Sequence, residues 1–169
     1  YGATRNLLWS IDLSNMNYNT LHSFVSSSEG VFTATITLSG DTIFGINEVG
    51  GAHGNGTVYS YNITNSTFQV LESIPAQQKF EGLGRIGNVL YTVLLDSTNG
   101  YSVAGMDFTS GSPTFNVLAN IDSVSIGYYP GPNLTPYKGT IYGIMNKGGA
   151  NTKGGLFKFE TTSNSIKME

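Results

Sequence analysis

Short runs of alternating or β-branched apolar residues follow one another along the chain, and turn residues separate them. The clearest set of runs covers residues 31–37, 42–46, 57–61 and 67–74. The turn segments between these runs cover residues 39–41, 50–56 and 62–66. This pattern predicts four antiparallel strands joined by hairpin turns. No segment keeps a 3.6-residue apolar spacing over two turns, so we expect essentially no helix.

The same pattern repeats along the chain. Shifting the sequence by 98 positions places residues 42–57 on residues 140–155 with 8 identities in 16 positions. Residues 88–93 and 101–106 form a weaker copy of 42–46 and 57–62. One apolar residue marks the fourth run of each copy, at Leu21, Leu71, Leu118 and Ile166. The steps between these residues are 50, 47 and 48, so the period is about 48 residues.

Four antiparallel strands in 40–50 residues are typical of one blade of a β-propeller. A β-sandwich gives no reason for a fixed period, and a β-solenoid usually repeats at a shorter one. We therefore predict an all-β, β-propeller-like fold of about three and a half four-stranded antiparallel blades in a single repeat domain, residues 1–169. The predicted parts are a half blade at 1–25 and blades at 30–74, 79–121 and 125–169.

Closed propellers use four to eight blades. We therefore expect a partial propeller that belongs to a larger one, or two chains that pair to complete it. The start at Tyr1 without an initiator Met fits a chain from which a leader was removed, or a piece of a longer protein.

Two segments carry a resemblance to a known repeat: Asp-Thr-Ile-Phe-Gly at 41–45, and the run from Gly50 to Tyr59 with its Gly-Gly loop and Gly-Thr-Val-Tyr strand. They resemble the kelch-related GloVer repeat of secreted and surface-anchored microbial proteins. The middle copy departs from it, because Thr92 replaces Gly45 and the loop shortens to 96–100. The resemblance implies a propeller-like β-fold outside the cell, and it brings no catalytic residues.

Charge and composition exclude several function classes. The chain has 8 Lys plus Arg, 11 Asp plus Glu and a net charge of −3, with no basic cluster, which argues against a nucleic-acid partner. No apolar stretch approaches the length of a membrane span. The absence of Cys and the presence of two His argue against a thiol enzyme or a Cys/His zinc site. We expect no metal, no cofactor and no catalytic residue.

Polar uncharged residues dominate the remainder, with 16 Asn, 18 Ser and 18 Thr among 169 residues. Four Asn-x-Ser/Thr sequons lie among them, at Asn55, Asn62, Asn65 and Asn133. A surface of this kind suits an extracellular or cell-surface glycoprotein. We therefore predict that location, with N-glycans at these four residues.

The glycine-rich loops at 50–56 and 148–154 have two interpretations. Consecutive backbone N–H groups there could cradle a phosphate, but a strand rather than a helix follows each loop, which favours a structural hairpin. His53, Asn55 and Asn151 lie in these loops and are candidate ligand-binding residues. His22 and His53 lack a neighbouring nucleophile and carboxylate in the sequence, and among the carboxylates Glu48 and Glu81 are not explained by turns.

The aromatic residues form two groups. Those that recur at equivalent strand positions indicate the core between blades: Phe44, Tyr91, Tyr142, Trp9, Tyr59 and Phe157. Tyr128, Tyr129 and Tyr137 do not recur and lie in a Pro/Gly-rich segment. That segment is either a stiff connection between blades or a surface of exposed Tyr that binds a ligand, so these three residues are further candidates for ligand binding.

The function that we predict is a non-enzymatic propeller module for adhesion or for binding protein or glycan at a cell surface. One alternative is a structural subunit of a surface filament or sheath, in which chains self-associate. Another is a hydrolase or lyase that uses carboxylates. The enzyme would show acidic or His side chains converging in one pocket.

Overall fold

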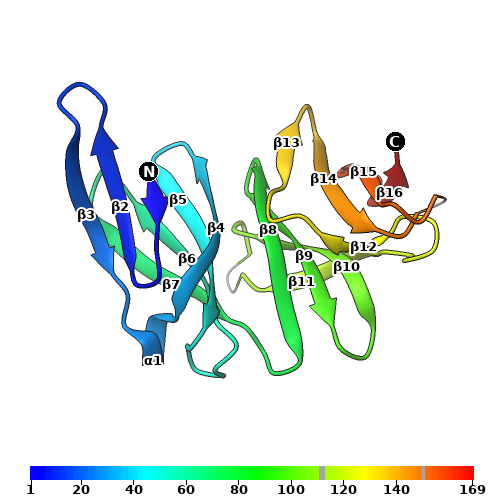
Figure 1. The fold of residues 1–169 in the computed structure, drawn as a ribbon, viewed down its shortest axis with the longest axis horizontal. Coiled ribbons are helices and arrows are strands. Elements are labelled where there is room, and N and C mark those ends of the chain that lie inside the picture. Colours follow the sequence, from blue (N-terminus) through cyan, green and yellow to red (C-terminus); the bar gives the residue numbers. More distant parts are fainter. Residues whose placement is uncertain (111–112, 150) are drawn as a thin grey trace. The chain divides into compact units, whose positions relative to one another are not determined.

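The computed structural model describes residues 1–110, 113–149 and 151–169, and within them the chain is almost entirely β (Figure 1). The chain divides into two compact units, residues 1–76 and 77–169. One four-residue helix, α1 (Ser26–Glu29), is present among the described residues, so the expectation of essentially no helix is confirmed.

The first unit contains two antiparallel sheets. The first sheet consists of β1 (Gly2–Ala3), β2 (Leu7–Asp12) and β3 (Asn17–Ser23). The second consists of β4 (Val31–Ser39), β5 (Thr42–Val49), β6 (Thr57–Asn62) and β7 (Thr67–Ser73). Leu8, Phe24 and Tyr59 are buried together between these sheets and form the centre of this unit's core.

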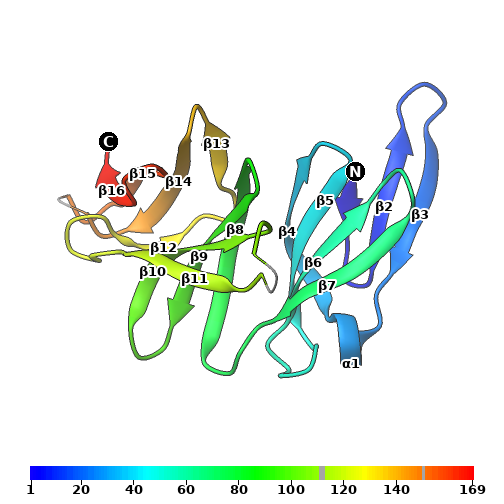
Figure 2. The same cartoon turned by 180° about the vertical axis from the view of Figure 1, so that it is seen from behind.

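The second unit also contains two antiparallel sheets, and Figure 2 shows β9, β10 and β11 side by side from behind. Its first sheet consists of β8 (Gln78–Ile86), β9 (Val89–Asp96), β10 (Gly100–Asp107) and β11 (Phe115–Asn120). Its second consists of β12 (Tyr128–Pro130), β13 (Thr135–Tyr137), β14 (Thr140–Lys147), β15 (Gly155–Glu160) and β16 (Ser165–Met168). Tyr91, Ile141 and Phe157 belong to the core between the two sheets.

A β-bulge explains the 48-residue signal. Val58 pairs with Glu72 while Tyr59 pairs with Val70, so Leu71 is the extra residue of a bulge in β7. Leu118 in β11 and Leu21 in β3 occupy the same kind of bulge. A bulge re-aims one side chain and increases the local twist. In these three copies the repeated apolar residue is therefore the residue at which the last strand of a sheet bends. Ile166 instead pairs with Phe159 without a bulge and occupies the place of Phe68, so its predicted equivalence with Leu71 was wrong.

Each blade-like sheet pairs a small residue with a large one across its middle strands. Gly45 lies opposite Tyr59 and Gly143 lies opposite Phe157. A Cβ at Gly45 would overlap the Tyr59 ring, so the ring lies directly over the glycine. In the third sheet Thr92 pairs with Ala104, so the larger side chain of the pair lies on β9 and the smaller one on β10.

Three details differ from the prediction. The first sheet has three strands rather than two, because Gly2 pairs with Trp9 just as Gly45 pairs with Tyr59. The last sheet has five strands, because its first strand is split into β12 and β13, which pair with the same edge of β14. The proline-rich segment between them lacks the N–H groups needed for a continuous ladder.

The third difference concerns the weaker repeat. Ala104 pairs with Thr92 and Met106 with Leu90, so Met106 rather than Gly105 stands at the place of Tyr61. The predicted alignment was wrong by one residue in this strand. A one-residue shift exchanges the two faces of a strand, and only the observed register buries Met106.

The glycine-rich loops are hairpin connections, as the structural interpretation predicted. The N–H of Gly56 donates to the carbonyl of Gly50 at 2.9 Å, and Gly154 donates to Gly148 at 2.8 Å. Gly56 has φ 97° and Gly154 has φ 72°, where side chains are strained, and strands rather than helices follow. The predicted match of Ala150 with Ala52 lies outside the described residues.

Tyr59 makes the first unit sensitive to alkaline pH. Burial raises the pKa of its phenol, and the nearby Thr33 side chain offsets this only in part. Among the described residues, no group hydrogen-bonds its hydroxyl in good geometry. The unfolded chain releases this proton above about pH 10 while the folded chain retains it, so folding stability falls as pH rises.

We therefore expect Tyr59→Phe to flatten the alkaline loss of stability by up to about 1.4 kcal/mol per pH unit above pH 10. At pH 7 the variant should gain about 1 kcal/mol, because an unsatisfied buried hydroxyl is removed. Urea unfolding between pH 7 and 11 measures both effects. Tyr18→Phe, at a tyrosine that is 51 % exposed, is the control and should leave the profile unchanged. A profile that Tyr59→Phe leaves equally steep would contradict the assignment.

Candidate functional site

A cavity of about 570 Å³ opens in the second unit, and we call it the Tyr-lined cavity. Its lining comes from the β9–β10 turn, the segment after β11, and β12. The lining residues are Leu95, Asn99, Gly100, Tyr101, Ile121, Asp122, Ser123, Tyr128 and Tyr129. Volumes of a few hundred to a thousand Å³ are typical of sites for small ligands.

Two aspartate-capped turns shape the rim of this cavity. Asp96 Oδ1 accepts the N–H groups of Thr98 and Asn99 at 2.9 and 3.0 Å, which fixes the β9–β10 turn. Asp122 Oδ1 accepts the Val124 N–H at 3.0 Å, and its Oδ2 accepts the Ser125 hydroxyl at 2.7 Å. These bonds stabilise the charged carboxylates and lower both pKa values.

The backbone of Tyr129 is held in the left-handed region, at φ 56°. A non-glycine residue there costs about 1–3 kcal/mol and needs support from its surroundings. The support includes the pairing of β12 with β14 on both sides of this residue, through Tyr128 with Lys147 and Pro130 with Met145. The Tyr129 ring itself is 54 % exposed, and its centroid lies 5.1 Å from that of Tyr128.

The first unit has the same backbone feature without the same opening. Phe32 lies two residues after Gly30, as Tyr129 does after Gly127, and it has φ 61°. There the Arg5 guanidinium lies 4.7 Å from the centroid of the Phe32 ring. In the second unit the residue at the place of Arg5 is Gly100, and Tyr101 follows it in the cavity lining. The Tyr-lined cavity therefore depends on residues particular to the second unit.

Like Tyr128, Tyr101 is half-buried. Burial raises the pKa of its phenol, so it stays protonated and can donate a hydrogen bond at neutral pH. Two charged residues of β8 also act on this pKa: Glu81 raises it and Lys79 lowers it. Lys79 Nζ and Glu81 Oε1 form an ion pair at 3.0 Å. The Lys147 ammonium lies 5.3 Å from the centroid of the Tyr129 ring.

The structure brings two of the predicted ligand-binding residues together and leaves the others elsewhere. Tyr128 and Tyr129 line the cavity. Tyr137, which is 58 % exposed, lies in β13 with the Lys138 ammonium 5.1 Å from its ring centroid. His53 and Asn151 are exposed in the glycine-rich loops. Asn55 is half-buried and donates its amide to the Pro75 carbonyl at 3.0 Å, which is a structural role.

Sequence reasoning missed Tyr101, Asn99 and Asp122. The repeat contained a signal for the first, because in the observed register Tyr101 stands where the other copies have Gly56 and Gly154. At this position the other two copies have a glycine without a side chain, whereas Tyr101 places an aromatic ring there. The one-residue misalignment of the weaker repeat concealed this exchange.

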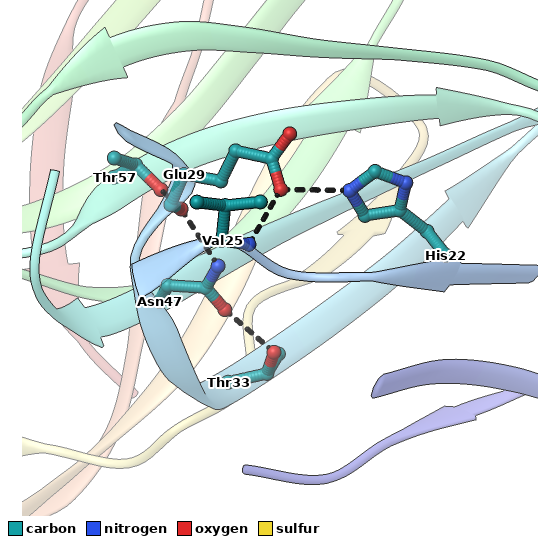
Figure 3. A network of polar contacts seen from close by, with 6 residues as sticks. All are labelled: His22, Val25, Glu29, Thr33, Asn47 and Thr57. Atoms are coloured by element: carbon teal, nitrogen blue, oxygen red, sulfur yellow. Dashed lines mark hydrogen bonds and ion pairs between the residues drawn. The ribbon is translucent and has the colours of Figure 1, made fainter. Parts of the chain in front are cut away.

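A second polar cluster lies under α1 in the first unit (Figure 3). The Glu29 carboxylate accepts the Val25 N–H at 2.8 Å and contacts His22 Nε2 at 2.9 Å, so it caps the start of α1. The His22 ring stacks on Phe68 with a centroid separation of 3.9 Å. These contacts pack His22 between Glu29 and Phe68, and the carboxylate neighbour that the local sequence did not show comes from seven residues further along the chain.

Buried Asn47 continues this network. It donates to the Glu29 carbonyl at 3.0 Å and accepts from the Thr33 hydroxyl at 2.6 Å. The Thr57 hydroxyl donates to the same Glu29 carbonyl. In the fourth sheet Met145 and Gly155 form the pair that corresponds to Asn47 and Thr57. The cluster therefore fixes the α1 turn locally and is not a repeated site.

The predicted glycosylation residues differ in how their amides are used. Asn62 Oδ1 accepts the Asn65 N–H at 3.0 Å and Asn65 Oδ1 accepts the Thr67 N–H at 3.1 Å, so both cap the β6–β7 turn. Asn133 is exposed between β12 and β13. The Asn55 amide is engaged with Pro75, as described above. Asn65 and Asn133 are exposed whereas Asn55 and Asn62 are half-buried, so a glycan would fit best at Asn65 and Asn133.

The two carboxylates left unexplained by turns belong to different units. Glu81 pairs with Lys79, and Glu48 is exposed in β5. In the part of the chain that the structure describes, no group of three or more His, Cys, Asp or Glu side chains is arranged to hold a metal ion. No helix in that part has the length and apolar character needed to cross a membrane.

Comparison with solved structures defines the fold. A protein from Agrobacterium tumefaciens described as TolB matches 97 % of this chain with a TM-score of 0.59 and 13 % identity. A prolyl endopeptidase matches 99 % with a TM-score of 0.63 and 10 % identity, and an oligogalacturonate lyase solved with manganese matches 96 % with 0.60 and 11 %. No family model and no curated protein matches the sequence.

These neighbours are β-propeller proteins, and the predicted fold class is confirmed: the chain is all-β and β-propeller-like. The chain spans 55 % of the TolB structure, 41 % of the lyase and 23 % of the endopeptidase. Identities this low carry the fold and nothing of the activity.

Proposed function

We propose that this chain is a non-enzymatic propeller module that binds glycan at a cell surface, and that the Tyr-lined cavity is its binding site. The observation that carries the proposal is the combination of three tyrosines with amide, carboxylate and hydroxyl groups around one opening. Aromatic faces contact the apolar faces of sugar rings, while fixed polar groups hydrogen-bond their hydroxyls.

The rigidity of the site supports binding by a preformed cavity. Asp96 and Asp122 fix the two rim turns through their own hydrogen bonds. Strands therefore hold loops whose side chains are already ordered, which reduces the entropy lost when a ligand binds. A concave opening of this volume suits a saccharide better than the broad, flatter surface used for a folded protein.

The lining supports binding rather than hydrolysis. Glycoside hydrolysis usually needs two carboxyl groups facing each other across the sugar. Among the lining residues, Asp122 is the single carboxylate, so the lining does not supply such a pair. The polar, uncharged composition and the sequon residues Asn65 and Asn133 support the cell-surface location. The GloVer resemblance remains a prediction that fits this location.

Tyr129→Ala tests the proposal. We expect at least about tenfold weaker glycan binding, because the exposed aromatic face is lost while the turn hydrogen bonds remain. A glycan array identifies a ligand, and calorimetric titration then compares the variant with the unaltered protein. Phe32→Ala, at the equivalent backbone position of the first unit, is the matched control and should bind normally. Equal losses in both variants, or no glycan bound by the unaltered protein, would refute the proposal.

A further inference from the structure

The charge that faces into the Tyr-lined cavity comes from one carboxylate. Asp122 is the charged residue among the lining residues, and Asp96 lies beside Asn99 on the opposite rim turn. Two ammonium groups also lie near the cavity, outside its lining. Lys79 pairs with Glu81 at 3.0 Å, and Lys147 lies over the Tyr129 ring.

Asp122 combines a fixed position with unused acceptor capacity. Val124 and Ser125 supply three hydrogen bonds to its two oxygens. A carboxylate offers about four lone-pair sites, so it can accept a further hydrogen bond from a ligand. The same turn bonds lower its pKa, and the charge therefore persists into acidic solution.

We propose that the Tyr-lined cavity selects amino sugars, whose ammonium group donates to Asp122, over neutral sugars, and that it excludes uronic acids. This inference rests on the proposed glycan-binding function. An ammonium–carboxylate hydrogen bond is about twice as strong as a neutral one, and tyrosine faces attract cations. A uronate would bring a second carboxylate against Asp122, and two like charges in a partly enclosed site repel each other.

The test compares tetramers of glucosamine, N-acetylglucosamine and galacturonic acid by calorimetric titration at pH 6 and low salt. We expect the glucosamine tetramer to bind at least about tenfold more tightly than the N-acetylated one. The galacturonate tetramer should bind about tenfold more weakly than the neutral ligand. Because the preference is electrostatic, raising the salt concentration should reduce the differences in affinity among the three tetramers. It should leave the affinity for the neutral tetramer unchanged.

Asp122→Asn assigns the preference to one carboxylate. In this variant the three affinities should fall within about threefold of one another, because the charge that distinguishes the ligands is gone. Asp107→Asn is the matched control, because Asp107 caps a turn through Thr109 in the same way but does not line the cavity. This control should keep the full preference for glucosamine.

The outcomes separate the inference from the function on which it rests. Galacturonate that binds as tightly as the neutral tetramer, or a preference that survives Asp122→Asn, overturns the inference and leaves glycan binding standing. Failure of all three tetramers to bind, together with an array on which no glycan is retained, overturns both.

Discussion

Threonine in place of Gly45 should destabilise the first unit by about 3 kcal/mol, because its side chain would overlap the buried Tyr59 ring. Tyr59→Ala alone should cost about 3–5 kcal/mol by emptying the space that the ring fills. The third sheet already carries Thr92 opposite Ala104 at this pair of positions. The double variant Gly45→Thr with Tyr59→Ala copies that solution and should cost at least about 2 kcal/mol less than the sum of the single changes.

Urea unfolding of the four proteins measures this coupling, with Trp9, the single tryptophan, as the fluorescent probe in the first unit. Gly155→Thr is the control, followed by circular dichroism. A Cβ at Gly155 meets the flexible end of Met168 rather than a ring, and Thr57 occupies the matching position of the second sheet. Its cost should stay below about 1 kcal/mol. Additive costs in the Gly45 and Tyr59 cycle would show that the pair is not a unit.

The strands were predictable because their signals are local. Alternation located β4 to β7 within a few residues, and the recurrence of Leu21, Leu71 and Leu118 marked the fourth strand before its bulge was known. A bulge that recurs in three copies leaves the same residue type at the same spacing. The repetition therefore made the fold class predictable from the sequence.

The cavity was only partly predictable, because it arises where the repeats differ. Tyr128 and Tyr129 were recognised since they break the pattern. Tyr101 was missed because its meaning depends on a register that shifts by one residue, and a register is set by pairing between strands rather than along one strand. The left-handed backbone of Tyr129 has no sequence signal either, since tyrosine is not a residue that favours it.

The polar network under α1 was not predicted at all. The sequence around Asn47 shows a polar residue within an apolar strand, which could face solvent or be buried. Burial requires partners that lie far away in the sequence, Thr33 and the Glu29 carbonyl. Buried amides are stable only when such partners are present, so the position became interpretable with the three-dimensional structure.

Methionine in place of Asn47 should cost about 2–3 kcal/mol of folding stability. The substitution removes the partner of the Thr33 hydroxyl and one of the two donors to the Glu29 carbonyl in a buried setting. Size is not the reason, because Met145 occupies the same position of the fourth sheet, also buried. The loss should come from polar groups left without partners.

A double-mutant cycle with Thr33→Val separates that cause from packing. If the Thr33–Asn47 bond matters, Thr33→Val should cost less in the Asn47→Met background than in the unaltered protein, by at least about 1 kcal/mol. Urea unfolding followed by Trp9 fluorescence gives the four free energies. Asn120→Met, at an exposed strand position, is the control and should change stability by less than about 0.5 kcal/mol. Independent effects of Thr33→Val and Asn47→Met would mean that the cost of methionine arises from its fit in the core rather than from the broken network.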